Sequence, residues 1–282
     1  MPTFIKSHDG LDIHYVYKQV KSSKPIILFL HGLGANYSEW KQTMALAKKK
    51  GYSTLAIDLR GHGLSSTPEQ FEFYALEHFA DDVKKIITHL KIKKLVLVGH
   101  SFGGSIAIVY CTKYLDSSLQ RMILIESTHK YPYKKYHELN VNPIFCFLLR
   151  KLVQLNILTN KSFPKIPELN LIELYKENMF FQIYDELYHT PFKVIFQCLD
   201  KAKDFSTQKE RKITSTLQSI QFPTLLITGT EDTIIDKEYS YKLKNLIPNS
   251  KLKVFEKASH QFPLEENHIL NKELFSFLAE KN

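Results

Sequence analysis

Several features are missing from this chain of 282 residues, and each absence excludes a class of protein. The three cysteines are widely spaced and form no Cys-x-x-Cys pair, which excludes a disulfide framework and a zinc site of four thiolates. No apolar run approaches the roughly 18 residues that a membrane span requires, and MPTFIKSHDG lacks the cationic start and apolar core of an export signal. We therefore expect a soluble, cytoplasmic protein with no membrane span.

Cofactor and nucleic-acid motifs are also missing. No Gly-x-Gly-x-x-Gly follows a strand pattern, and no histidine and carboxylate group has the spacing of a zinc protease, so we expect neither a metal nor any other cofactor. The net charge is +9, but the lysines are scattered, the longest basic run is KKK at 48–50, and no nucleic-acid-binding motif is present. This distribution is typical of solvated helix faces and predicts no nucleic-acid partner.

Hydrophobic periodicity predicts an α/β fold. The apolar fraction of 44% is enough for a large core. Two alternating segments, TFIKS and LDIHYVYK, predict an N-terminal hairpin, and the later strands are continuous apolar runs separated by amphipathic helices. We therefore expect a mostly parallel, eight-stranded sheet with helices on both faces. The predicted parallel strands lie within KPIILFLHG, YSTLAIDL, KKLVLVG, RMILIES, FPTLLITG and KLKVFEKA.

The alternation of strands and helices is interrupted once, by a helical insertion. It stops after Glu126 and resumes at FPTLLITGTED, residues 222–232, and the segments between carry helical patterns broken by prolines. Neither border is rich in Gly, Ser or Pro, so the insertion is not a separate domain on a linker. We predict a core of residues 1–127 and 220–282 with a helical cap at 128–219.

Polar residues follow the predicted strands at the points where the strands end. In such a sheet, ligands bind beyond the carboxyl ends of the strands. Ser101 follows LVLVGH, Asp232 follows LLITGTE, and His260 follows the last strand, in that chain order. Glycines on both sides of Ser101, in GHSFGG, predict a sharp turn from strand to helix that presents the hydroxyl. The three side chains can therefore converge at one edge of the sheet.

These motifs resemble those of the α/β-hydrolase superfamily, along essentially the whole chain. GHSFG matches the Gly-x-Ser-x-Gly nucleophile elbow, and the order Ser, Asp, His is that of the family's triad. The chain looks like the capped, serine carboxylesterase-like subgroup, which includes pimeloyl-carrier-protein methyl esterases and carbon–carbon bond hydrolases. The resemblance implies that Ser101 is the nucleophile, that His260 is the general base and that Asp232 orients His260.

The resemblance also implies an oxyanion hole of two backbone N–H groups. In the family, one belongs to the residue after the nucleophile, here Phe102, and the other to the residue after the His-Gly of the first loop, here Leu33 in HGLG. His31 is expected to brace that loop. His100 belongs to the elbow and is expected to point away from the face that presents Ser101.

The acid that orients His260 has two alternatives to Asp232. Glu126 ends the strand RMILIES, where some α/β-hydrolases place their acid, and Asp236 lies one turn beyond Asp232. Asp232 is favoured because GTED matches the Gly-x-x-Asp element of the family.

The nucleophile limits the reaction. Epoxide hydrolases and haloalkane dehalogenases of the family carry aspartate where this chain has Ser101, so those activities are not expected. The leading hypothesis is a carboxylesterase that cleaves a small-molecule acyl ester through an acyl-serine intermediate. A narrower version is an acyl-carrier-protein methyl esterase, since the cap has 14 Lys or Arg against 9 Asp or Glu and would attract an acidic carrier. The alternatives are a carbon–carbon bond hydrolase or a thioesterase on the same triad, and a fold retained for binding without turnover.

Overall fold

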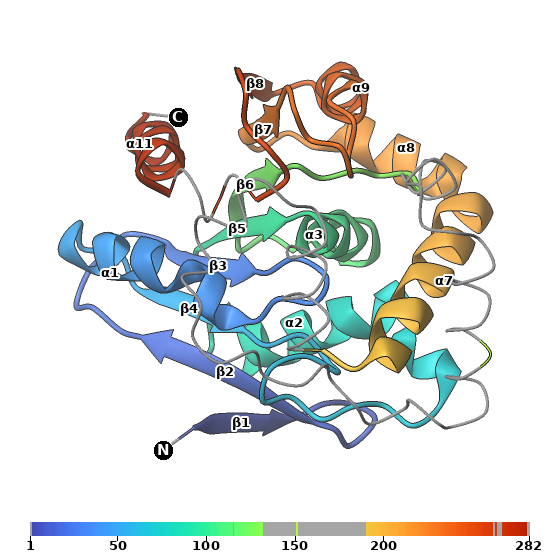
Figure 1. Ribbon diagram of the computed structural model, residues 1–282. Coiled ribbons are helices and arrows are strands. Elements are labelled where there is room, and N and C mark those ends of the chain that lie inside the picture. The colour runs from blue at the N-terminus through green and yellow to red at the C-terminus, as the bar shows by residue number, and fades with distance from the viewer. Residues whose placement is uncertain are drawn as a thin grey trace, which may run out of the picture.

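The structure is a computed structural model that describes residues 2–114, 116–131, 151, 190–261, 263 and 267–280. One eight-stranded sheet forms its centre, with helices on both faces, as the sequence predicts (Figure 1). The spatial order of the strands is β1-β2-β4-β3-β5-β6-β7-β8. The strands are β1 (Thr3–Lys6), β2 (Asp12–Lys18), β3 (Ile26–Leu30), β4 (Thr54–Ile57), β5 (Leu95–His100), β6 (Leu119–Ile125), β7 (Thr224–Gly229) and β8 (Ser250–Phe255).

The sheet is antiparallel only at its N-terminal edge. β1 pairs with β2, and β2 pairs with β4, in antiparallel register. Every other neighbouring pair is parallel. The central strands are continuous apolar runs because both of their faces are covered, and β4, β5 and β7 are buried at every residue. The carboxyl ends of the parallel strands therefore lie along one edge, where a ligand site is expected.

The helices form two layers, and the strand residues alternate between them. Leu28 and Leu30 share a core with α2 and α3, whereas Ile27 and Phe29 share the opposite core with α1 and α11 (Figure 1). Among the described residues, no helix combines the length and apolar character needed to cross a membrane. The helices formed by the described residues are η1 (Tyr37–Trp40), α1 (Lys41–Lys49), η2 (Phe71–Tyr74), α2 (Leu76–His89), α3 (Phe102–Lys113), α7 (Phe192–Gln208), α8 (Glu210–Ser219), α9 (Glu238–Leu246) and α11 (Asn267–Ala279).

Most of the predicted cap lies outside the described residues. Of residues 128–219, the structure describes 128–131, 151 and 190–219. The last of these segments forms α7 and α8, in agreement with the helical pattern of the sequence. Val194, Cys198 and Phe205 of α7 are buried in the core that includes α2 and α3. Helix α7 therefore packs onto the helical layer formed by α2 and α3. The cap as a unit stays a prediction.

Candidate active site

Ser101 lies at the turn between β5 and α3 in a strained backbone conformation. Its φ of 50° and ψ of −114° are rare for a residue that has a side chain. The turn is so tight that a Cβ at Gly99 would lie 2.5 Å from the carbonyl oxygen of Gly103, and one at Gly103 would lie 2.4 Å from that of Leu30. The N–H of Ser101 donates to the carbonyl oxygen of Ile125 at 2.9 Å. Strand, helix and neighbouring strand together hold the hydroxyl in place.

The structure brings the three predicted side chains together. Nε2 of His260 lies 2.9 Å from Oγ of Ser101, and Nδ1 of His260 lies 2.8 Å from Oδ2 of Asp232. All three residues are buried. Oδ1 of Asp232 accepts hydrogen bonds from the N–H groups of Ile234 and Ile235, each at 2.8 Å, which fixes the carboxylate. This chain of hydrogen bonds is suited to moving a proton from the hydroxyl to the imidazole while the carboxylate holds the other ring nitrogen.

The environment of His260 makes it a stronger base than an ordinary histidine. Burial lowers its pKa, but the carboxylate of Asp232, with a contribution from Glu126, outweighs burial and raises the pKa above 6.5. A higher pKa increases the tendency of His260 to accept the proton of Ser101. It also means that His260 becomes protonated, and stops acting as a base, at a pH that is still above 6.5.

Of the three carboxylates considered for orienting His260, Asp232 makes the shortest contact with it. Oε2 of Glu126 lies 3.8 Å from Nδ1 of His260, against 2.8 Å for Oδ2 of Asp232. Oδ1 of Asp236 instead accepts a hydrogen bond from the N–H of Glu238 at 2.9 Å, at the start of α9. The geometry favours Asp232 for this role, while Glu126 is near enough to affect the charge of His260.

The two predicted oxyanion donors lie on segments that pack together beside Ser101. Phe102 is the first residue of α3, and Leu33 belongs to the HGLG loop after β3. A Cβ placed on Gly32 of that loop would lie 3.7 Å from Cβ of Ser101. Within the described part of the chain, the N–H groups of Leu33 and Phe102 donate to no other protein group. Both are therefore available to an oxygen that approaches Ser101.

His31 braces the HGLG loop. Its Nδ1–H donates to the carbonyl oxygen of Gly32 at 2.7 Å, and its Nε2 accepts from the N–H of Leu59 at 3.0 Å. Burial, together with the nearby ring of His62, lowers the pKa of His31 well below 6.5, so the ring is neutral. A neutral ring with one donor and one acceptor matches these two contacts. His31 thus joins the loop after β3 to the loop after β4.

His100 contacts two buried carboxylates, and its ring lies beside that of His260, with the ring centroids 5.1 Å apart. Its Nδ1 lies 3.0 Å from Oε1 of Glu39, and its Nε2 lies 3.4 Å from Oε2 of Glu126. Sequence reasoning assigned no role to Glu39. The sequence feature that could have pointed to Glu39 is a carboxylate in SEW, immediately before the apolar positions of the first helix. The fold leaves this residue only 7% exposed.

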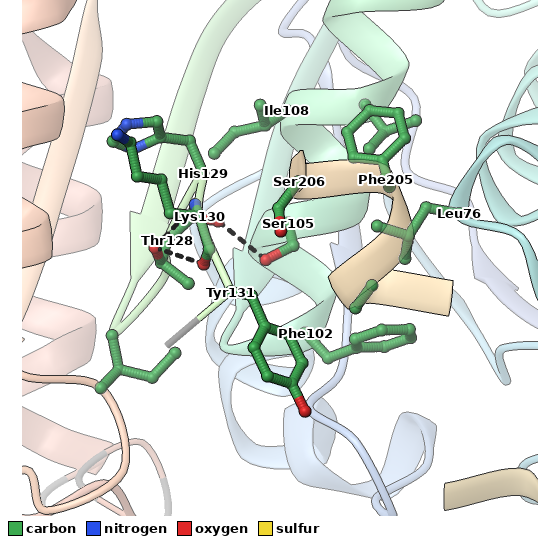
Figure 2. A pocket seen from close by; sticks show the side chains of 13 residues that line it. Leu76, Phe102, Ser105, Ile108, Thr128, His129, Lys130, Tyr131, Phe205 and Ser206 are labelled. Atoms are coloured by element: carbon green, nitrogen blue, oxygen red, sulfur yellow. Dashed lines mark hydrogen bonds between the residues drawn. The ribbon is translucent and has the colours of Figure 1, made fainter. Parts of the chain in front are cut away.

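A small cavity adjoins the elbow between α3, α7 and the segment after β6 (Figure 2). Its volume is about 30 Å³, and its wall includes Phe102, Leu76, Phe205 and Tyr131. Oγ of Ser105 donates to the carbonyl oxygen of Thr128 at 2.8 Å, one of the bonds drawn in Figure 2. Phe102 follows the predicted nucleophile and forms part of this wall, so it connects the elbow to the cavity.

One group of metal-ligand atoms overlaps the triad. In the described part of the chain, His100, Glu126 and His260 offer ligand atoms within 4.8 Å of one another. Both ring nitrogens of His260 already face Ser101 and Asp232, so a cation here would replace the hydrogen-bonded chain. The expectation that the protein uses no metal stays a prediction.

Comparison with known proteins shows which proteins this chain is similar to. A family model described as the alpha/beta hydrolase fold matches residues 25–267. The bifunctional esterase/perhydrolase DCH of Acinetobacter calcoaceticus is 24% identical over 302 residues, covering 98% of this chain and 99% of that protein. Epoxide hydrolase 4 of Mus musculus is 26% identical over 298 residues, covering 96% of this chain and 77% of that protein. The solved structure of an esterase from Exiguobacterium antarcticum is similar with a TM-score of 0.76 and 21% identity, covering 99% of this chain and 100% of that chain.

Proposed function

Because this chain belongs to the alpha/beta hydrolase fold family, we propose that it is a serine hydrolase that cleaves carboxylic esters through an acyl-serine intermediate. The observation that carries the proposal is the hydrogen-bonded chain from Ser101 through His260 to Asp232. Proteins named as esterases are among those similar to this chain, and they agree with this reaction. The similarity to an epoxide hydrolase concerns the fold, since a serine stands at the elbow here.

Acylation begins when Nε2 of His260 takes the proton of Ser101 as Oγ attacks the ester carbonyl carbon. The tetrahedral intermediate places negative charge on the former carbonyl oxygen, and the N–H groups of Leu33 and Phe102 stabilise it there. Asp232 stabilises the protonated imidazole and keeps its ring oriented. His260 then gives the proton to the leaving alkoxide, the C–O bond breaks, and the acyl group stays on Ser101.

Deacylation repeats these steps with water. Nε2 of His260 removes a proton from a water molecule as its oxygen attacks the acyl carbon, and the same two N–H groups stabilise the second tetrahedral intermediate. Collapse of the intermediate returns the proton to Oγ of Ser101 and releases the carboxylic acid. The reaction therefore needs no group beyond the five residues named for the two half-reactions.

The cavity beside Phe102 is the part of the described structure that would accept the acyl chain. Phe102 of its wall directly follows Ser101, so an acyl group on Oγ of Ser101 would extend along this wall. The cap of residues 128–219 would supply the remaining wall.

The acidic-carrier hypothesis belongs to the same proposal. The cap has 14 basic against 9 acidic residues, and such an excess of positive charge speeds encounter with an acidic partner. A carrier-bound acyl methyl ester should then be hydrolysed faster than the free ester, and the advantage should shrink as salt is added. Equal rates at low and high salt contradict the partner and leave the esterase proposal intact.

A panel of p-nitrophenyl esters of graded chain length tests the proposed reaction. We expect turnover of these esters by the wild type and loss of turnover in Ser101→Ala. Ser219→Ala, at the exposed end of α8, is the matched control and should behave like the wild type. Turnover that survives in Ser101→Ala contradicts the serine mechanism.

Two further substrates separate the alternatives. Faster cleavage of a thioester, or of a vinylogous diketone, than of any ester moves the assignment to a thioesterase or to a carbon–carbon bond hydrolase. A wild type that cleaves none of these substrates contradicts catalysis on this triad and favours a binding role.

A further inference from the structure

His100 lies between two buried carboxylates that come from different parts of the chain. Glu39 belongs to η1, and Glu126 follows β6. Oε1 of Glu39 lies 3.0 Å from Nδ1 of His100, and Oε2 of Glu126 lies 3.4 Å from Nε2. The exposed fractions are 7% for Glu39, 5% for His100 and 0% for Glu126, so bulk water stabilises none of these charges. Since His100 directly precedes Ser101, contacts that hold its ring also hold the elbow.

The two carboxylates favour a charged ring at His100. Each ring nitrogen of His100 lies within ion-pair distance of a carboxylate oxygen, and a neutral ring would place a lone pair near one of these oxygens. Burial lowers the pKa of His100, but Glu39 and Glu126 outweigh it and raise the pKa well above 6.5. Among the described groups, Oε1 of Glu39, Nδ1 of His100 and both carboxylate oxygens of Glu126 make no hydrogen bond, so His100 contacts the two carboxylates as ion pairs. The positive charge of His100 therefore offsets the burial of these oxygens.

Each carboxylate also reaches a second part of the site. Oε2 of Glu39 accepts a hydrogen bond from the N–H of Gly32 at 3.1 Å, inside the HGLG loop. Oε2 of Glu126 lies 3.8 Å from Nδ1 of His260. Nε2 of His100 also lies 3.2 Å from the backbone carbonyl oxygen of His260. One ring thereby connects the loop of the predicted oxyanion hole, the nucleophile elbow and the loop of the predicted general base.

We propose that His100 is a positively charged positioning residue which, held between Glu39 and Glu126, fixes the HGLG loop and His260 around Ser101. This inference rests on the proposed function, because it assigns these side chains to the same ester hydrolysis. They act through Gly32 and His260 and touch no reacting atom themselves. Since the groups that they position stabilise the transition state, losing a carboxylate should lower kcat more than it changes KM.

Two variants that keep the side-chain shape separate positioning from packing. In Glu39→Gln, we expect kcat for a p-nitrophenyl ester to fall about tenfold with KM constant within about twofold, because the HGLG loop loses its charged anchor. Burial and the nearby Asp232 raise the pKa of Glu126 to about 7, so Glu126 carries only part of its charge where His260 titrates. In Glu126→Gln, we expect the acid limb of the kcat/KM profile to move to lower pH, because the remaining charge that raises the pKa of His260 is gone.

Glu280→Gln is the matched control for both variants. It removes a surface ion pair with Lys251 at 2.7 Å and should change neither kcat nor the pH profile. Melting temperatures of all three variants show which proteins are folded at the assay temperature. For a folded Glu126→Gln, a pH profile that superimposes on the wild type contradicts the proposal. For a folded Glu39→Gln, a kcat within about twofold of the wild type does the same.

An NMR measurement on the inactive Ser101→Ala protein separates this inference from the proposed function. We expect the ¹⁵N signals of His100 to be those of a doubly protonated ring at about pH 8. The signals of His100 are assigned as those that disappear from the spectrum of the double variant Ser101→Ala/His100→Asn. A neutral ring at that pH overturns the inference even if the wild type is an active esterase. If the ring is doubly protonated but the wild type cleaves no ester, the proposed function is overturned. The positive charge of His100 between Glu39 and Glu126 is then supported.

Discussion

Two pairs of buried histidines lie near the carboxyl edge of the sheet, and their pKa values are shifted in opposite directions. The ring centroids of His100 and His260 are 5.1 Å apart, and those of His31 and His62 are 5.2 Å apart. Burial lowers the pKa of all four rings. The pKa values of the first pair nevertheless end above 6.5, and those of the second pair end below it.

Nearby carboxylates account for this difference. Asp232 and Glu126 outweigh the burial of His260, whereas Nδ1 of His31 and Nδ1 of His62 donate to backbone carbonyl oxygens at 2.7 and 3.0 Å. Asp58 also raises the pKa of His62, but by less than burial lowers it. A carbonyl oxygen carries no full charge and cannot offset desolvation in the same way. One residue type at similar depth is therefore the proposed base in one pair and a neutral brace in the other.

The largest expected effect comes from replacing one histidine of each pair by glutamine and comparing the two losses of activity. His260→Gln removes the general base, and we expect kcat/KM for a short-chain ester to fall by about 10⁵-fold. His62→Gln, the matched control from the neutral pair, should lower it by less than about tenfold, because His62 moves no proton. Steady-state kinetics of the two variants provide the test. Similar losses in both would contradict the distinction between the pairs.

The carboxylate next to His260 gives the second largest effect. Asp232→Asn leaves the shape intact but favours the wrong tautomer of His260, so we expect kcat to fall by about 10⁴-fold. Asp236→Asn, at the start of α9, should stay within about twofold of the wild type. Rates measured under single-turnover conditions compare the two variants. A larger loss in Asp236→Asn than in Asp232→Asn would transfer the role to Asp236.

The neutral pair should be visible in the stability of the protein rather than in its activity. Burial lowers the pKa of His62 to about 4 in the folded protein, against 6.5 in an unfolded chain. As pH falls through 6.5, the unfolded chain binds a proton on His62 before the folded protein does, so the free energy of unfolding decreases until about pH 4. The full contribution is about 3 kcal/mol.

His62→Gln should remove this part of the pH dependence. Urea unfolding of wild type and variant at about pH 7 and about pH 5 measures it, and we expect the wild type to lose about 2 kcal/mol more than the variant. An equal loss of stability in both proteins would show that His62 is not held neutral by burial.

The smallest expected effect is a displacement of the pH profile. His260 acts as a base only when neutral, and its pKa is raised, so activity should fall as pH decreases while the pH is still above 6.5. The kcat/KM of a neutral ester, measured from about pH 5 to about pH 9, gives the midpoint of the acid limb. A midpoint below 6.5 would contradict the raised pKa of His260 and group it with His31 and His62.

The fold and the three converging side chains could be predicted because their signals are local. Continuous apolar runs indicate the central strands, and Ser101, Asp232 and His260 each lie in the turn or loop that follows a strand. The parallel arrangement then brings all strand ends to one edge without any further information. The fold prediction is confirmed by the family match, and the catalytic roles stay proposals.

Other features depend on distances that a sequence does not contain. Order along the chain allowed Asp232, Asp236 or Glu126 beside His260, and only coordinates separate 2.8 Å from 3.8 Å. Glu39 gave no motif because its burial results from packing η1 against β3 and β4, which come from separate segments. Helical patterns in the sequence were sufficient to predict α7 and α8. Most of the rest of the predicted cap lies outside the described residues.

Mass spectrometry of the acylated protein tests the central claim most directly. Acid quenching during turnover of a p-nitrophenyl ester, followed by digestion, should reveal one acyl group on the peptide that contains Ser101. The same treatment of Ser101→Ala should leave that peptide unmodified. An acyl group on another residue of the wild type, with turnover retained in Ser101→Ala, would contradict the assignment of Ser101 as the nucleophile.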